Sequence, residues 1–170
     1  VGDGSGAVVE AEAIGVVGHD RLEARVVGVT LHERPSPRVV VVQALPKGER
    51  GDLSVELLTE VGADVVVPWS ASRSVAVWKG EKAQRGVEKW RTTAREAAKQ
   101  SRRPFVPDID PLASTSDVVA LLSAVAASGG FVEEVWLEAL GFEGGDACAD
   151  ESDGLAGAAL ALQEGPGDAK

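Results

Sequence analysis

The chain reads VVVVQALPKGER over residues 39–50, GDLSVELLTEVGADVVVPW over 51–69 and RSVAVWKGEKAQRGVEKWRTTAREAAKQSRRPFVP over 73–107. An apolar run ends in a Pro-Lys-Gly turn, an amphipathic helix follows, and a second apolar run leads into a long basic helix. Continuous apolar runs of this length are typical of strands buried on both faces of a parallel sheet. The order therefore predicts a parallel α/β unit with one positively charged face.

The spacing of apolar residues sets the first elements of this unit. Residues 38–45 and 64–69 are the two predicted buried strands. The helix between them runs from Asp52 to Val61, and Gly62 stands where a C-cap glycine is expected. Its apolar face is predicted to consist of Leu53, Leu57, Leu58 and Val61.

The second helix is predicted over residues 81–103 and carries two faces. Its apolar residues recur at spacings of three and four, as in a helix that packs on a core. They are Ala83, Val87, Trp90, Ala94 and Ala97. Basic residues recur at similar spacing on another face, and these are Arg91, Arg95, Lys99 and Arg102.

The flanking sequence predicts further elements. A strand is expected at 105–109, a helix from Ser114 or Thr115 to Ala127, a short helix at 131–140 and a last strand at 158–162. Valine-rich residues 7–17 and 22–32 predict two antiparallel strands around a turn at 18–20. The prolines of HERPSPR (32–38) indicate a linker.

Charge is distributed unevenly over the 170 residues, whose net charge is −10. Residues 73–103 hold ten basic and three acidic side chains, a net of +7, whereas residues 131–170 hold ten acidic side chains and one lysine, a net of −9. A local basic patch matters more for nucleic-acid binding than the overall charge. The helix at 81–103 is therefore a candidate contact for a polyanion, although charge runs are most often only solvated faces.

Composition argues against several classes of protein. The single cysteine, Cys148, and the histidines His19 and His32 indicate no disulfide and no metal site. The sequence shows neither a membrane-spanning run nor a signal peptide, and a cytoplasmic location is expected.

Methionine is absent. Val1 is thus either an alternative start or the first residue after a missing beginning.

Other motifs have ordinary explanations beside functional ones. Pro46-Lys47-Gly48 lies where α/β proteins present N–H groups to anions, but an ordinary strand–helix turn is the commoner outcome. The glycine-rich segment 2–6 lacks the preceding strand of a dinucleotide site and is predicted to be a turn. Trp90 is predicted to lie in the core, while Trp69 and Trp78 are core residues or base-stacking platforms. No catalytic residue can be assigned.

A series of motifs resembles the ribosomal RNA small subunit methyltransferase E family. The chain has QALPKG at 43–48, ELLTEVG at 56–62 and EAAKQSRR at 96–103, in the order and at the approximate spacing of that family. The resemblance covers residues 39–111 most strongly. It implies a SPOUT-type enzyme that transfers a methyl group from S-adenosylmethionine to a uridine N3 of 16S rRNA. Such enzymes are dimers that hold the cofactor in a trefoil knot.

The resemblance implies site residues by position. The expected RNA contacts are Lys47, Arg50, Arg73, Arg91, Arg95, Gln100 and Arg103. The segment LALQEG (160–165) is similar to a cofactor-binding strand of the family and makes Leu162 and Glu164 the expected cofactor contacts. The family's main cofactor loops, which should follow that strand, do not occur in the sequence.

The predicted architecture is therefore an α/β protein whose two domains are both incomplete. Residues 1–37 correspond to part of a PUA-like β-barrel. Residues 38–170 correspond to an incomplete SPOUT domain, a parallel sheet with an acidic insertion at about 129–157. The resemblance suggests truncation at both ends, so the alternative to an active enzyme is a catalytically inactive RNA-binding fragment that lacks the cofactor knot.

Overall fold

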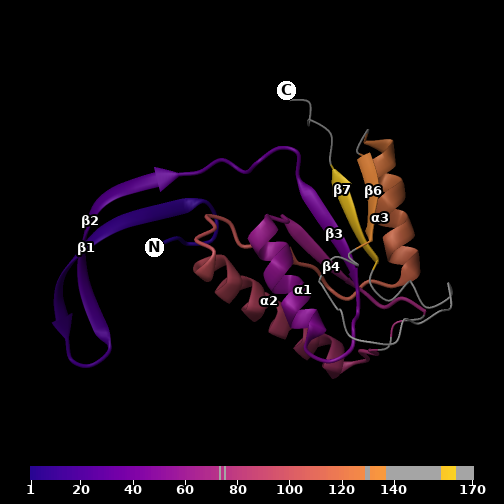
Figure 1. Ribbon diagram of the computed structural model, residues 1–170, viewed down its shortest axis with the longest axis horizontal. Helices are drawn as coiled ribbons and strands as arrows, with labels where there is room; N and C mark the ends of the chain where they lie inside the picture. The colour runs from indigo at the N-terminus through magenta and orange to yellow at the C-terminus, as the bar shows by residue number, and fades with distance from the viewer. Residues whose placement is uncertain (73, 75, 129–130, 137–157, 164–170) are drawn as a thin grey trace, which may run out of the picture.

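A five-stranded sheet covered by three helices forms the body of the molecule, and a two-stranded ribbon extends from it in the computed structural model (Figure 1). The structure describes residues 1–72, 74, 76–128, 131–136 and 158–163. The elements are β1 (Ala7–Val17), β2 (Arg21–Leu31), β3 (Val39–Ala44), α1 (Arg50–Val61), β4 (Val65–Trp69), α2 (Glu81–Gln100), β5 (Asp108–Ile109), α3 (Thr115–Ala127), β6 (Phe131–Trp136) and β7 (Ala158–Gln163).

The strand order of the sheet is β5-β4-β3-β7-β6. Strands β3, β4 and β5 are parallel, as the sequence predicted. Strand β7 pairs antiparallel with both β3 and β6, so the sheet is mixed and the expectation of a wholly parallel sheet is wrong at this strand. The predicted strand at 105–109 is reduced to the two residues of β5.

The predicted helix at 131–140 is also wrong where the structure describes it. Residues Phe131–Trp136 form β6, and all six pair with β7. Phenylalanine, valine and tryptophan favour strands, and the ladder offered by β7 outweighs the helical spacing of a short segment. Residues 137–140 lie outside the described part of the chain.

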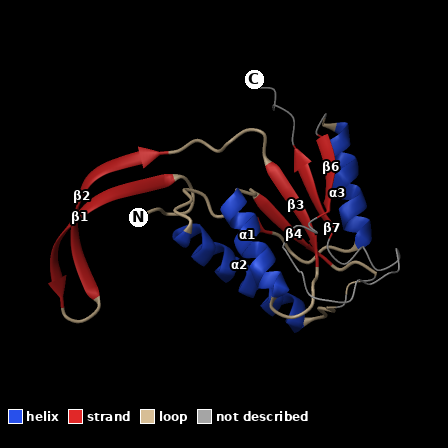
Figure 2. Ribbon diagram, in the orientation of Figure 1, coloured by secondary structure: helices blue, strands red, loops and turns tan. Residues whose placement is uncertain are grey.

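Helices α1 and α2 cover one face of the sheet (Figure 2). Trp90 is 2% exposed and packs into the cluster with Val41, Val66 and Val55. Gly51 lies against its ring, because a Cβ there would be 3.2 Å from the indole. The apolar stripe predicted for α2 is confirmed from Val87 onward.

The predicted buried face of α1 is wrong in part. Its buried residues are Gly51, Val55, Leu58 and Thr59, whereas Leu53 and Val61 are 44% and 77% exposed. The helix packs against Trp90 with the side that carries Gly51, where a Cβ would have to push the indole back by a few tenths of an ångström. Gly62 ends α1 at φ 95°, as expected of a C-cap glycine.

Helix α3 covers the opposite face. Its Val118 and Val125 pack with Val40 and Val42 of β3, and these strand residues alternate with those that face α1 and α2. Ser114 caps the helix, and its side chain and that of Asp117 form a capping box. Hydrogen bonds from Ser114 hold the pKa of Asp117 below its ordinary value.

The ribbon of β1 and β2 is held to the body at its base only. The Gly6 N–H donates to Pro104 O at 3.0 Å, and the Val106 N–H donates to Gly4 O at 2.9 Å. Gly6 has φ 109°, and a Cβ there would lie 2.7 Å from the Phe105 ring, so this position requires glycine. Among the described residues the two strands form a two-stranded sheet, to which only an isolated bridge between Gly2 and Val8 is added, so a PUA-like barrel stays a prediction.

One face of the ribbon is apolar and exposed. Val9 opposes Val29 and Val16 opposes Leu22, and the exposed fractions of Val29 and Leu22 are 61% and 65%. A hairpin of two strands is marginally stable alone in water. Its attachment to the body is therefore the main constraint on its position.

The buried carboxylate of Asp64 joins the strands at their amino ends. Asp64 is 6% exposed, and its carboxylate accepts a hydrogen bond from the Val39 N–H at 2.9 Å and from Arg34 at 3.4 Å. Its main-chain oxygen accepts the Asp108 N–H at 2.9 Å. One residue thus links β3, β5 and the segment that precedes β3.

No helix within the described residues is long and apolar enough to cross a bilayer.

We expect Asp64→Ala to lower the free energy of unfolding by about 1–3 kcal/mol, because the partly buried Val39 N–H loses its acceptor. Asp64→Asn keeps an acceptor oxygen and should lose less. The control Asp20→Ala, at the exposed turn of the ribbon, should stay within about 0.5 kcal/mol of the parent. Urea titrations followed by tryptophan fluorescence measure all three, and equal losses for Asp64→Ala and Asp20→Ala would contradict the role of Asp64.

Candidate nucleic-acid interface

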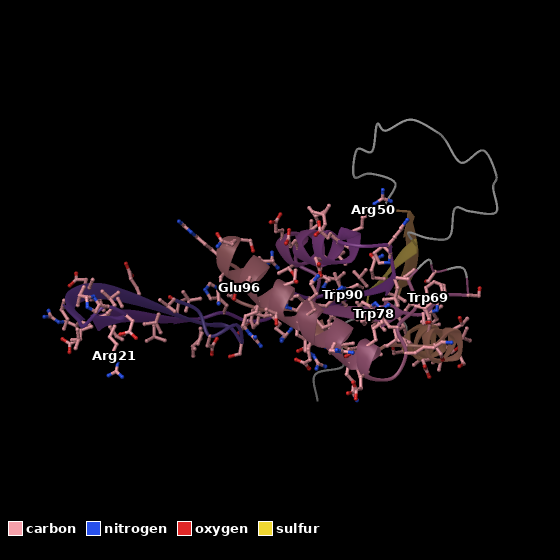
Figure 3. All side chains as sticks on the ribbon, turned by 90° about the horizontal axis from the view of Figure 1, so that it is seen from below. Arg21, Arg50, Trp69, Trp78, Trp90 and Glu96 are labelled. Atoms are coloured by element: carbon pink, nitrogen blue, oxygen red, sulfur yellow. The ribbon has the colours of Figure 1, made fainter. Side chains whose placement is uncertain are left out.

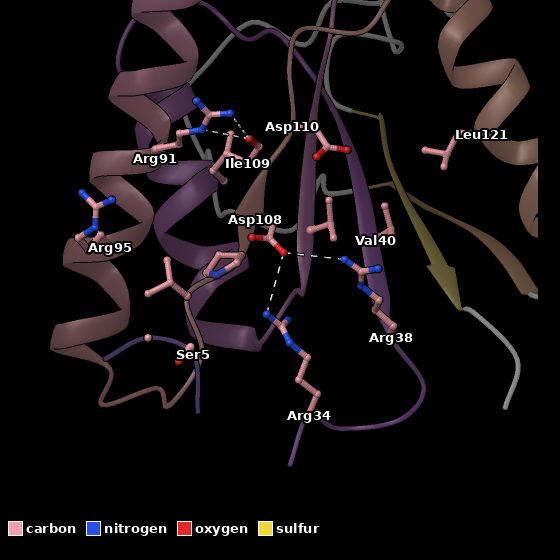
Figure 4. Close-up of a pocket in the computed structure, with 14 residues that line it drawn as sticks. Ser5, Arg34, Arg38, Val40, Arg91, Arg95, Asp108, Ile109, Asp110 and Leu121 are labelled. Carbon is pink, nitrogen blue, oxygen red and sulfur yellow. Dashed lines mark hydrogen bonds and ion pairs between the residues drawn. The ribbon is translucent and has the colours of Figure 1, made fainter. Parts of the chain in front are cut away.

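A polar cleft lies at the amino ends of the parallel strands. It has a volume of about 640 Å³ and is bounded by α2, the start of β3, the β5 segment and the base of the ribbon (Figure 4). Four arginines and two aspartates line it, which leaves two positive charges in excess. They are Arg34, Arg38, Arg91, Arg95, Asp108 and Asp110.

Arg91 is one of the predicted RNA contacts, and its guanidinium is largely committed to the protein. Its Nε and Nη2 donate to the Ile109 carbonyl at 3.2 and 3.0 Å, and Nη1 donates to Glu88 at 2.5 Å. The side chain therefore ties α2 to β5. It contributes positive potential to the cleft but has few donors left for a ligand.

Arg95 lies one helical turn further along α2 and is exposed. No hydrogen bond or ion pair joins its guanidinium to another of the described residues. Arg95 also lines a second cavity, of about 540 Å³, together with Lys99, Arg102 and Arg103. The helix predicted to run to residue 103 ends at Gln100, so Arg95 and Lys99 of the predicted basic face lie on α2, whereas Arg102 lies just beyond it.

Two arginines of the cleft were missed by the sequence analysis, which treated residues 32–38 only as a linker. Arg34 lies 4.9 Å from the centre of the Phe105 ring and 4.0 Å from the Asp108 carboxylate. Arg38 lies 3.9 Å from the same carboxylate. A signal was available, since residues that immediately precede a parallel strand lie at its amino end, beside the starts of neighbouring strands.

The two aspartates of the cleft differ in their surroundings. Asp108 is 62% exposed and lies between Arg34 and Arg38. Burial raises the pKa of Asp110, and the negative charge of Asp108 raises it further, against the opposing effect of Arg38 and Arg91. Both effects disfavour the ionised form of the Asp110 carboxyl group.

Lys47 and Arg50 lie at the other end of the sheet. Lys47 is exposed in the turn after β3, where Gly48 has φ 64°, and Arg50 begins α1. Figure 3 shows Arg50 and Trp69 toward the end of the body away from the ribbon, whereas Glu96, next to Arg95, lies toward the ribbon. The structure thus separates Lys47 and Arg50 from Arg91 and Arg95.

Gln100 and Arg103 lie at the end of α2 and beyond it. Gln100 is exposed and borders a shallow groove between α1 and α2, where Glu56, Glu60 and Glu96 also lie. The Arg103 guanidinium lies against Gly62, in space that a Cβ there would occupy. It faces the negative end of the α1 dipole, which gives Arg103 a structural role beside any contact with RNA.

Of the three remaining predicted site residues, the structure describes Leu162 alone. Arg73 and Glu164 lie outside the described residues. Leu162 pairs with Val40 on one side and Val132 on the other, inside the sheet.

The side chains of Trp78 and Trp69 both contact other residues of the protein. Trp78 packs edge-on against Trp90 with ring centroids 5.2 Å apart, and Trp69 Nε1 donates to Thr115 Oγ1 at 3.3 Å. Within the described part of the chain, no group of three histidine, cysteine or acidic side chains is placed to hold a metal ion.

Comparison with known proteins covers the region that contains both the cleft and the motifs. A family model described as RNA methyltransferase domain matches residues 32–133. Ribosomal RNA small subunit methyltransferase E of Mycobacterium bovis is 46% identical over 92 residues, 54% of this chain and 35% of that protein. The protein of the same name from Bacillus subtilis is 38% identical over 69 residues, 41% of this chain and 27% of that protein.

Solved structures show the same fold. A ribosomal RNA small subunit methyltransferase E from Neisseria gonorrhoeae, bound to S-adenosylmethionine, gives a TM-score of 0.52 at 24% identity, over 65% of this chain and 46% of that one. A Legionella pneumophila protein solved with bound S-adenosylmethionine gives 0.59 at 22% identity, over 69% and 48%.

The family resemblance carried by the sequence motifs is confirmed by these matches. The chain spans about a third or less of the length of the curated relatives that it matches. Because the family model covers more than half of the residues, the chain belongs to the RNA methyltransferase domain family.

Proposed function

We propose that this chain is part of an enzyme that methylates the N3 of a uridine in 16S rRNA, with S-adenosylmethionine as the methyl donor. The observation that carries the proposal is the family match over residues 32–133, a region that includes the exposed basic end of α2. The complete protein would act in the cytoplasm as a homodimer on the small ribosomal subunit.

The chemistry of the substrate sets what the protein must provide. The uracil N3 carries a proton, so the base must lose it or be hydrogen-bonded into a nucleophilic state. A base inside a stack cannot reach a methyl donor, so it must be held out of the stack. The sulfonium of the bound cofactor supplies an electrophilic methyl group, and alignment of the reacting atoms provides much of the rate enhancement.

The described residues serve the RNA side of this reaction. Arg95 offers a guanidinium without a protein partner among the described residues, beside two cavities that other basic residues line. Arginine is well suited to phosphate because its planar fork donates two parallel hydrogen bonds. We assign Arg95 as the leading RNA contact and Arg91 as a source of positive potential that also holds α2 to β5.

The proposal also includes the other expected contacts, which rank after Arg95. Lys47 and Arg50 would contact RNA near the carboxyl ends of the strands, and Arg73 follows β4 in the sequence. Gln100 and Arg103 would contribute at the end of α2. Leu162 and Glu164 remain the proposed cofactor contacts.

Methyl transfer tests the proposed reaction directly. The chain is incubated with isotopically labelled S-adenosylmethionine and 16S rRNA that lacks N3-methyluridine, and nucleosides are analysed by mass spectrometry. We expect label at a uridine N3 in this RNA and none in the same RNA already methylated. No transfer, together with retained RNA binding, would instead support the inactive RNA-binding fragment.

Arg95→Ala tests the RNA-binding surface. We expect weaker binding to all RNA sequences and a fall of about one in the slope of log affinity against log salt, because one phosphate contact is lost. The matched control is Arg85→Ala on the same helix, since Arg85 is exposed, pairs with Glu81 and does not line the cleft. An unchanged slope for Arg95→Ala, measured by fluorescence anisotropy, would remove Arg95 from the interface.

A further inference from the structure

The two basic cavities adjoin each other, because Gly4, Arg95 and Val106 line both. Their combined lining runs from the segment before β3, across the base of the ribbon, to the residues after α2. Seven basic side chains and three aspartates contribute to it. They are Arg34, Arg38, Arg91, Arg95, Lys99, Arg102 and Arg103, with Asp3, Asp108 and Asp110.

The end of this groove at Arg34 and Arg38 is held by weak ion pairs. Both guanidiniums approach the Asp108 carboxylate, at 4.0 and 3.9 Å, beyond hydrogen-bonding distance. The three side chains are 42%, 44% and 62% exposed. Exposed ion pairs at such separations contribute little to stability. An anion that binds the two guanidiniums more closely can therefore replace the Asp108 carboxylate at a small cost in free energy.

Arg34 and Arg38 differ in how far the protein holds them. Arg34 also donates to the buried Asp64 carboxylate at 3.4 Å and lies over the Phe105 ring, so its position is set. The one ion pair of Arg38 among the described residues is with Asp108, and its charge also acts on Asp110 without a direct bond. Arg34 therefore supplies a fixed charge, and Arg38 supplies a guanidinium that is able to turn toward a ligand.

We propose that the adjoining cavities form one groove for the phosphodiester backbone of RNA, in which Asp108 occupies the Arg34–Arg38 end until a phosphate group displaces it. The groove rests on the proposed function, since it identifies where the substrate backbone of that reaction lies. Two features favour a phosphate-bearing ligand. Guanidinium forks match phosphate oxygens, and several cationic side chains along an extended groove fit a polymer of regularly spaced charges.

This displacement predicts opposite effects for the two partners of one ion pair. Arg38→Ala removes a phosphate contact, so affinity for single-stranded RNA should fall about three- to tenfold and the salt slope should fall by about 0.7. Asp108→Asn removes the competing anion, so affinity should rise about two- to fivefold at low salt. Arg38→Lys should keep most of the salt slope and lose part of the affinity, because lysine keeps the charge without the fork.

Matched controls separate this groove from general charge effects. Arg21→Ala removes a positive charge near the tip of the ribbon, far from the groove (Figure 3). Glu60→Gln removes a negative charge on α1, outside both cavities. Fluorescence anisotropy of a labelled RNA oligonucleotide, titrated with the full chain over a series of salt concentrations, measures every variant, and thermal unfolding confirms that each is folded.

The possible results distinguish failure of the groove from failure of the proposed enzymatic function. Equal slopes for Arg38→Ala and Arg21→Ala, or no gain for Asp108→Asn beyond Glu60→Gln, would overturn the groove, while methyl transfer scored separately would leave the enzyme proposal standing. Competition by polyglutamate as potent as that by RNA of equal charge concentration would show a general anion surface and also overturn it. Failure of the parent chain to bind RNA would overturn both.

Discussion

The arrangement of the amino ends of the strands depends on a single buried carboxylate. Asp64 accepts the first N–H of β3 through its side chain and the first N–H of β5 through its main-chain oxygen. A buried carboxylate needs such partners, because an unpaired charge in the interior is strongly unfavourable. The same group holds Arg34, so the residue that aligns the strands also sets the direction in which the chain enters the sheet from the ribbon.

This alignment explains why a protein with a net charge of −10 has a basic groove. The segment before β3, the end of α2 and the base of the ribbon are far apart along the chain and meet at the amino ends of the strands. Some of their arginines act mainly within the protein. Arg91 holds β5 and Arg103 lies against the end of α1, whereas Arg38, Arg95 and Arg102 are exposed and less committed to the protein among the described residues.

Tertiary contacts also account for the errors of the sequence analysis. Periodicity alone placed Leu53 and Val61 on the buried face of α1, but the indole of Trp90 selects the side that contains Gly51. Helical spacing suggested a helix at 131–140, while pairing with β7 makes residues 131–136 a strand. Each error concerns a short segment whose preferred face or state is decided by a neighbour distant in the chain.

The sequence by itself determined the order of elements from β1 to α3, the parallel pairing of β3 with β4, the core face of α2 and the family, because buried runs, helical stripes and ordered motifs are local properties. Only the tertiary structure decided which charges share a surface. Lys47 and Arg50 were grouped with Arg91 and Arg95 by motif, but α2 runs back from the carboxyl ends of the strands to their amino ends and carries its basic residues away from the turn after β3. Arg34 and Arg38 joined the groove for the same reason, since the proximity of residues distant in sequence is a product of packing and not of local pattern.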